Sequence, residues 1–118
     1  MVELSPEGVF RLHPKIRWAG LSNDRGEIIF CQMRPAVQSI TPEEDDRSLL
    51  ELGAVIMTGV AERSSPYAGR MQCLVILYEK FGQLIVKQKD GNLVLTVERE
   101  DAPQTLLDII KSFDWTEA

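Results

Sequence analysis

The stretch MQCLVILYEKFGQLIVKQKDGNLVLTVERE, residues 71–100, decides the fold of this chain. It contains three apolar runs, which span residues 71–79, 83–89 and 92–100. Asp90-Gly91 between two such runs is a strong signal for a two-residue hairpin, and Gly82 is expected to turn the chain between the first two. The stretch therefore predicts three consecutive antiparallel strands and not a regular alternation of strands with helices.

A second hairpin is expected upstream. It consists of strands KIRWAGLS (15–22) and EIIFCQM (27–33), joined by the turn NDRG (23–26). Gly26 supplies the positive φ that such a turn needs. Strict alternation places Ile28 and Phe30 on one face of the second strand, and it places Ile29, Cys31 and Met33 on the other. Because apolar side chains occupy both faces, the sheet should be covered on both sides.

Between the hairpin and the three strands, residues 42–64 predict a long helix. Thr41 is a suitable N-cap, Pro42 fits the first helical position, and Glu44 completes a capping box. The apolar residues form two stripes along this helix: Leu49, Leu52, Ile56 and Val60, and Leu50, Ala54, Met57 and Ala61. A helix with water on its outer side needs only one stripe. We therefore expect a second cover, either another element or another chain.

The apolar core of that helix, LLELGAVIMTGVAE (49–62), is too short for a membrane span, which needs about 20 residues. It carries Gly53 and Gly59, each of which costs about 1 kcal/mol relative to alanine inside a helix. Either a tight fit against the sheet or the close approach of another backbone would offset this cost. Both explanations remain open on the sequence alone.

Helices are also expected at the two ends of the chain. Ser5 is suited to cap a short first helix that has Pro6 in its first turn. Asp101 is expected to cap the last helix, with Pro103 in the first turn and Gln104 at the capping-box position. The amphipathic segment 105–115 would bury one stripe, which comprises Leu106, Ile109, Ile110 and Phe113.

Composition and motifs narrow the function. The 118 residues are expected to form a single domain, and the net charge of -5 disfavours nucleic acid and anionic membranes as partners. The sequence contains neither a phosphate-binding glycine loop nor a nucleophile elbow. With His13 as the only histidine and Cys31 and Cys73 as the only cysteines, a Cys/His zinc site is excluded. We expect no catalytic residue, no cofactor and no metal.

The start of the sequence lacks the apolar core of a signal peptide. Both cysteines lie within apolar runs, where a reduced thiol behaves as a small buried hydrophobe. These two features together favour a cytoplasmic location, in which cysteines stay reduced.

The element order and turn residues resemble the roadblock/LC7 family. WAGLSNDRGEII (18–29) is similar to the family's opening hairpin, 42–64 to its long central helix, and 71–100 to its three closing strands. The resemblance spans about residues 15–113 within a domain of 1–118, and the opening is similar to that of divergent archaeal members. The family usually begins with a solid helix, whereas SPEGVFRLHP (5–14) is short and interrupted by a glycine.

The resemblance implies a profilin-like α+β fold with a five-stranded antiparallel sheet in the order 2-1-5-4-3. The long central helix would cover one face of this sheet and the terminal helices the other. In that order Cys31 and Cys73 lie on opposite edges, roughly 19 Å apart at the usual strand spacing. We therefore expect no disulfide between them.

The resemblance also implies a function. Such proteins are non-enzymatic dimers that pair through the central helix and the strand after it, here 42–64 and 71–79, and many scaffold or regulate small Ras-like GTPases. The implied dimer interface consists of Leu50, Gly53, Met57, Gly59, Val60, Cys73, Val75 and Leu77. The alternative is a small-molecule sensing domain, because profilin-like sheets also carry ligand pockets.

Overall fold

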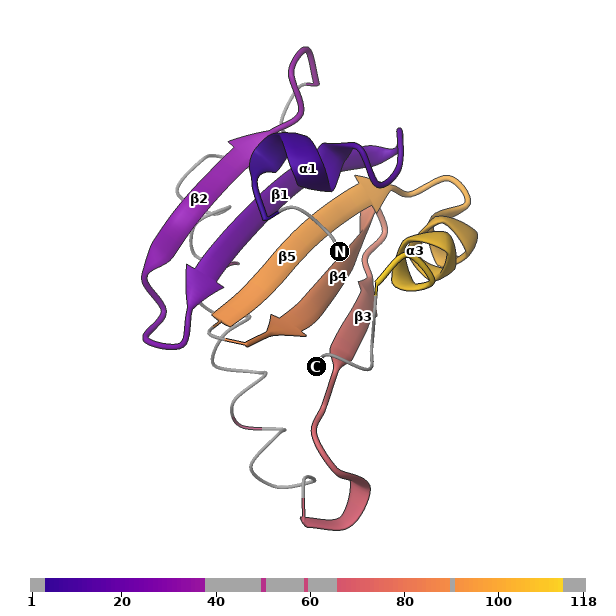
Figure 1. Cartoon of the computed structure of the whole chain (residues 1–118). Helices are drawn as coiled ribbons and strands as arrows, with labels where there is room; N and C mark the ends of the chain where they lie inside the picture. The colour runs from indigo at the N-terminus through magenta and orange to yellow at the C-terminus, as the bar shows by residue number, and fades with distance from the viewer. Residues whose placement is uncertain (1–3, 38–49, 51–58, 60–65, 90, 114–118) are drawn as a thin grey trace.

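The computed structural model describes residues 4–37, 50, 59, 66–89 and 91–113, which form a five-stranded antiparallel sheet with helices packed against it (Figure 1). The strands are β1 (Ile16–Asn23), β2 (Ile28–Met33), β3 (Cys73–Leu77), β4 (Phe81–Gln88) and β5 (Gly91–Glu98), and the helices are α1 (Pro6–Phe10) and α3 (Ala102–Ile110). The strand order is β2-β1-β5-β4-β3, as the resemblance implied. Cys31 in β2 and Cys73 in β3 lie on opposite edges and are not joined by a disulfide, which confirms that expectation.

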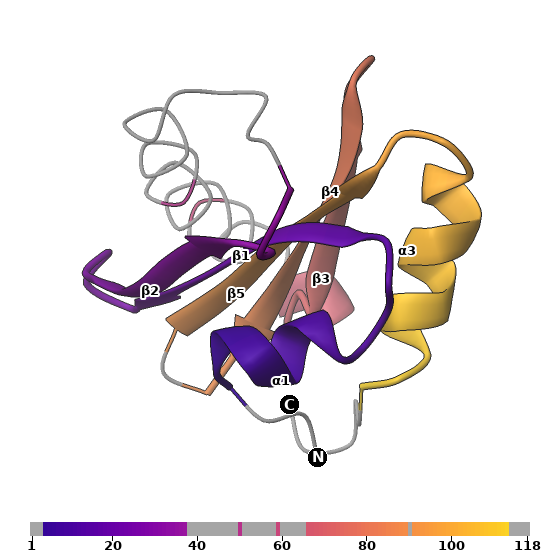
Figure 2. The same ribbon diagram turned by 90° about the horizontal axis from the view of Figure 1, so that it is seen from above.

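The helices α1 and α3 cover the same face of the sheet, as Figure 2 shows. Val9 and Phe10 of α1 and Leu106 and Ile109 of α3 are buried against one apolar cluster. The strands contribute Ile16, Ala19, Leu21, Leu84, Val86, Leu93, Leu95 and Val97 to it. We call this side of the sheet the terminal-helix face.

A second cluster lies on the opposite side of the sheet, which we call the Leu50 face. It is built from Trp18, Leu50, Ile85 and Val94. Gly20 lies beneath it, where a Cβ atom would come within 2.6 Å of Cη2 of Trp18 and 3.1 Å of Cδ2 of Leu50. Two clusters on two faces confirm that the sheet is covered on both sides. The long helix expected at 42–64 lies outside the described residues, apart from Leu50 and Gly59.

A β-bulge in β2 overturns the expected alternation of its side chains. Leu21 of β1 pairs with Phe30, but the next residue, Ser22, pairs with Ile28, so Ile29 is an extra residue. Ile28 therefore packs on the Leu50 face together with Cys31 and Met33, while Phe30 packs on the terminal-helix face. The expectation that Ile28 and Phe30 share a face was wrong, because strict alternation assumes an unbroken ladder.

Gly82 does not turn the chain, contrary to expectation. It lies inside β4 opposite Leu77, and the turn is closed instead by the N–H of Tyr78, which donates to the carbonyl of Phe81 at 2.9 Å. A Cβ atom at Gly82 would lie 3.0 Å from Cβ of Ala102 and 3.2 Å from a methyl carbon of Leu106. The glycine is therefore needed where α3 packs closely on the sheet.

Of the other two turns, the one at 23–26 lies where it was expected, whereas the β4–β5 turn ends before Gly91, which was expected to lie within it. Gly26 has a φ of 81°, and the side-chain oxygen of Asn23 accepts the N–H of Arg25 at 2.9 Å and that of Glu27 at 3.0 Å. In the β4–β5 hairpin, Gln88 pairs with Gly91, so Gly91 is the first strand residue; Asp90 lies outside the described residues. A Cβ atom at Gly91 would collide with the carbonyl oxygen of Ser22.

The two helix starts differ in how they are capped. The hydroxyl of Ser5 accepts the N–H of Gly8 at 3.1 Å, which confirms Ser5 as the N-cap of α1. Asp101 makes no capping hydrogen bond and has a left-handed backbone with φ of 55°. Asp101 occupies the predicted N-cap position, but an N-cap side chain normally reaches the helix from an extended backbone, so its left-handed conformation explains the missing hydrogen bond. The carboxylate of Asp101 instead pairs with Lys15 at 3.6 Å.

The last helix has the expected buried side but different bounds. The side chain of Gln104 donates to Asp108 at 2.8 Å instead of completing a capping box. Leu106 and Ile109 are fully buried, whereas Ile110 and Phe113 are partly buried against the same cluster. The helix α3 runs from Ala102 to Ile110, so it begins directly after Asp101, as expected, and ends earlier than the predicted amphipathic segment 105–115.

Candidate association surface

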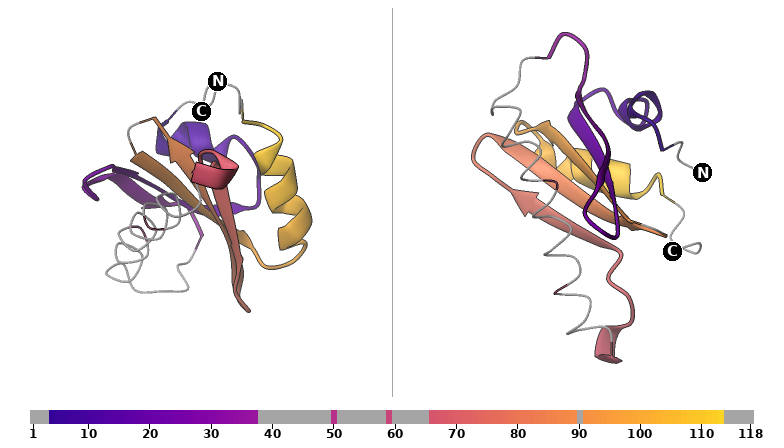
Figure 3. Two further views of the ribbon diagram at one scale, coloured as in Figure 1. Left: turned by 90° about the horizontal axis from the view of Figure 1, so that it is seen from below. Right: turned by 90° about the vertical axis from the view of Figure 1, so that its left-hand side faces the viewer.

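The strand β3 forms one edge of the sheet. Within the described part of the chain its pairing partner is β4, with a continuous register from Cys73 opposite Val86 to Leu77 opposite Gly82. The chain enters this strand from residues 66–68, a helical turn that projects beyond the sheet (Figure 3). An edge strand presents a row of backbone groups that can pair with another chain.

The hydrogen bonds at the two ends of β3 show which residues face that open edge. The N–H of Lys87 donates to the carbonyl of Gln72, and the N–H of Tyr78 donates to the carbonyl of Phe81, each at 2.9 Å. In an antiparallel ladder, alternate residues of a strand bond the same neighbour. The even-numbered residues of this segment therefore bond β4. The backbone groups of Cys73, Val75 and Leu77 point to the open edge.

The side chains of this edge are apolar and partly uncovered. Val75 is 43% exposed and Leu77 is 47% exposed, both on the side of the sheet that carries the terminal helices. Cys73 is half-buried against the cluster of that face, and burial raises the pKa of its thiol. Leu74 and Ile76 pack on the Leu50 face. The edge thus offers aliphatic surface together with backbone hydrogen-bonding groups.

Tyr78 extends the same surface beyond the end of β3. Its side chain is 40% exposed, and its ring lies 4.8 Å from that of Phe81 between the ring centroids. The sequence did include Tyr78 in the predicted strand, but it gave no sign of this aromatic pair. The pair forms across the turn between Tyr78 and Phe81, which was expected later in the sequence, at Gly82.

The opposite edge of the sheet differs from β3. There, β2 is interrupted by the bulge at Ile29, whose side chain is 61% exposed. Bulges distort the row of hydrogen-bonding groups and are a common protection of edge strands. The register of β3 with β4 has no such break, and no charged side chain lies between Cys73 and Leu77. Of the two edges, β3 is the one suited to pair with another strand.

The structure separates the residues of the implied dimer interface. Cys73, Val75 and Leu77 lie together along β3, and Gly59 is exposed. Leu50 has no exposed surface, because it packs against Trp18 over Gly20. It therefore belongs to the core of its own chain. The remaining three residues, Gly53, Met57 and Val60, lie outside the described residues.

Arg34 has a structural role that sequence reasoning missed. Its guanidinium donates to the carbonyls of Ile16 at 2.6 Å, Phe10 at 2.7 Å and His13 at 2.8 Å. It also lies 5.0 Å above the centre of the Phe10 ring. These contacts fasten α1 and the loop after it to the sheet. The partners are 18 to 24 residues away in the sequence, so no local pattern could have indicated them.

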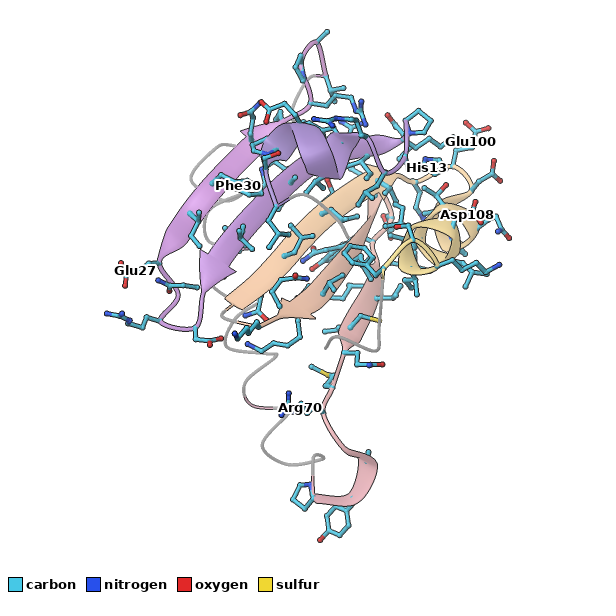
Figure 4. The ribbon with its side chains drawn as sticks, in the orientation of Figure 1. His13, Glu27, Phe30, Arg70, Glu100 and Asp108 are labelled. Carbon is cyan, nitrogen blue, oxygen red and sulfur yellow. The ribbon has the colours of Figure 1, made fainter. Side chains whose placement is uncertain are left out.

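The titratable side chains that the structure describes are spread over the molecule. Figure 4 shows His13, Glu27 and Arg70 at different ends of the molecule. The Nδ1 atom of His13 accepts the N–H of Lys15 at 3.1 Å, which makes it part of a local turn. In the described ranges, no group of three His, Cys, Asp or Glu side chains could hold a metal ion. Nor does any helix in these ranges have the length and apolar character to cross a membrane.

Comparisons with known proteins place the fold. No protein-family model matches the sequence, and no curated protein matches it. Among solved structures, an MglB with a tetrameric arrangement superposes with a TM-score of 0.69 at 20% identity, over 89% of this chain and 76% of that one. The Roadblock/LC7 domain from Streptomyces avermitilis gives a TM-score of 0.65 at 12% identity, over 90% and 86%. This chain has the roadblock/LC7 fold.

A third match agrees with the first two. The gliding protein MglB from Thermus thermophilus has a TM-score of 0.62 at 22% identity, over 89% of this chain and 77% of that one. The resemblance drawn from the strand order and turn residues is therefore confirmed for the fold. The low identities also fit the divergence that was expected from the sequence.

Proposed function

We propose that this chain is a non-enzymatic, homodimeric interaction module that scaffolds or regulates a small Ras-like GTPase in the cytoplasm. The observation that carries the proposal is the β3 edge, where Val75 and Leu77 expose aliphatic surface beside backbone groups that face away from β4. The roadblock/LC7 resemblance implies pairing through this strand and through the segment 42–64. A second copy would cover the edge and extend the sheet.

Self-association has further support. One structural neighbour, MglB, is described with a tetrameric arrangement. In the present chain Gly59 is exposed, and a Cβ atom added there would meet no atom within 4 Å. This open position is consistent with a place where another backbone approaches. The side chains of Arg34 and His13 form hydrogen bonds with backbone groups of their own chain, which agrees with a non-enzymatic role.

The test of the dimer is size-exclusion chromatography with light scattering on the wild type, Val75→Lys and Ile29→Lys. All three should fold, since both positions are exposed edge residues. The wild type and Ile29→Lys are expected to have twice the mass of one chain, whereas Val75→Lys should be monomeric because its charge would be buried at the interface. A monomeric wild type, or a stable dimer of Val75→Lys, would contradict the proposal.

The GTPase partner needs a separate test. Immobilised wild-type protein is incubated with small GTPases from the same cell, loaded with either GDP or GTP. We expect one nucleotide state to be retained more strongly, and Val75→Lys to lose that retention while Ile29→Lys keeps it. A different result is that the wild type is a dimer but retains both nucleotide states equally, or retains neither. Such a result would contradict the GTPase partner but not the homodimer.

One observation favours the alternative, a small-molecule sensing domain. Ser22 Oγ, Gln83 Oε1 and Asn92 Oδ1 are buried and find no hydrogen-bond partner among the described residues. Ser22 and Asn92 are opposite each other in the β1–β5 register. Buried polar atoms are nearly always bonded, so a bound molecule could supply the partner. A sensor predicts a rise in melting temperature with a metabolite that Asn92→Ala abolishes; the scaffold predicts no such rise.

A further inference from the structure

The hydrogen-bonding pattern of β3 restricts how two copies could pair. The backbone groups that face the open edge belong to Cys73, Val75 and Leu77, and those of the residues between them face β4. In an antiparallel pair, hydrogen bonds form only where outward-facing residues of both strands lie opposite each other. Any register that sets an odd-numbered residue against an even-numbered one is therefore excluded.

The open edge is centred on Val75. The bonds that tie the segment to β4 at its two ends involve Gln72 and Tyr78, which lie at equal distances from Val75 in the sequence. If a two-fold axis passes through Val75, the whole segment lies opposite the same segment of the second copy. The next permitted registers are displaced along the strand, and each displacement leaves outward-facing groups unpaired at the ends.

We propose that β3 pairs with β3 of a second copy with Val75 on the two-fold axis, a refinement that rests on the dimer of the proposed function. Val75 then exchanges hydrogen bonds with Val75 of the second copy. Cys73 does the same with Leu77 of the second copy, on both sides of the axis. These pairs supply about six backbone hydrogen bonds across the interface.

The side chains agree with this register. On the terminal-helix face, Val75 meets Val75 of the second copy, and Cys73 meets Leu77 of the second copy. On the opposite face, Leu74 lies beside Ile76 of the second copy. All of these contacts join apolar groups, and the strand contains no charge that would be set against its own copy. This self-complementarity is why a second copy, and not a foreign strand, is the occupant that the edge fits.

The register is tested by oxidative cross-linking. In the variant Cys31→Ser/Leu77→Cys, the introduced thiol lies opposite Cys73 of the second copy, at a Cα separation of about 5.5 Å that a disulfide can bridge. After mild oxidation with copper phenanthroline, most of the protein should run as a covalent dimer on a non-reducing gel. The control Cys31→Ser retains only Cys73, whose two copies would be about 13 Å apart and should not cross-link.

Light scattering before oxidation separates the two ways of failing. A monomeric Cys31→Ser protein would overturn both the register and the homodimer, and would leave the edge open to a foreign strand. A dimeric protein in which Leu77→Cys fails to cross-link would overturn the register alone. Efficient cross-linking of the Cys31→Ser control would also overturn it, because the axis would then pass near Cys73. Reduction with dithiothreitol must restore the single-chain band in every case.

Discussion

Replacing Arg34 with alanine should lower the free energy of unfolding by about 3 kcal/mol. The guanidinium donates to three backbone carbonyls, those of Phe10, His13 and Ile16. Charge-assisted hydrogen bonds contribute about 1.5 kcal/mol each at the low end of their range, which applies here because the side chain is only partly buried. The stacking on Phe10 adds about 0.5 kcal/mol to this loss. Because alanine has no rotamers to order on folding, the side-chain entropy that arginine loses, about 2 kcal/mol, is no longer lost and offsets part of it.

Urea denaturation followed by far-UV circular dichroism measures this loss, with all variants at one protein concentration because a dimer's stability depends on it. Arg34→Lys keeps the charge but lacks the planar fork that reaches several carbonyls, so it should recover only part of the loss. Arg25→Ala is the matched control. Its side chain is 85% exposed and pairs with Glu27 at 3.8 Å, so its removal should cost less than about 0.5 kcal/mol. A cost for Arg34→Ala no larger than that of Arg25→Ala would refute this account of the arginine.

Three further predictions concern single positions. Ser5→Ala should cost about 1 kcal/mol in the same assay because it removes a helix cap, whereas Asp101→Ala should cost less than about 0.5 kcal/mol; equal costs would contradict the assigned caps. Gly91→Ala should abolish two-state unfolding near room temperature, since the new methyl group would meet the backbone of Ser22; a folded variant of wild-type stability would show that the strands can separate there. Because burial raises the pKa of the Cys73 thiol, the stability that this group contributes is present at neutral pH and is lost as pH rises through the alkaline range. Wild-type stability should therefore fall more steeply above about pH 9 than that of Cys73→Ala, and parallel curves would be evidence against this linkage.

The parts of the fold that depend on local sequence were predictable. Alternating apolar runs and short polar breaks locate the five strands, because strand pairing and turn chemistry act over a few residues. The capping hydroxyl of Ser5 and the positive φ of Gly26 follow from the same local rules. The order of the strands came from the family resemblance and not from any such pattern.

The parts that failed depend on contacts between distant segments. Gly82 looked like a turn residue, but its role is set by Ala102 and Leu106 of α3, which are remote in sequence. The bulge at Ile29 reflects the pairing of β1 with β2, which an alternating pattern does not record. The candidate surface shows the same division. The apolar run indicated Val75 and Leu77, while the burial of Leu50 depends on Trp18 and Gly20 across the sheet.

The bulge in β2 also limits how many chains can join one continuous sheet. If two copies join through β3, the combined sheet ends on both sides in a β2 strand whose ladder is broken at Ile29. A third copy would find no continuous row of hydrogen-bonding groups to extend. Strand pairing of this kind stops at two chains, so the mass of the assembly should reach a plateau with rising concentration instead of increasing without limit. One irregular residue at the far edge thus separates a finite dimer from an open-ended fibre.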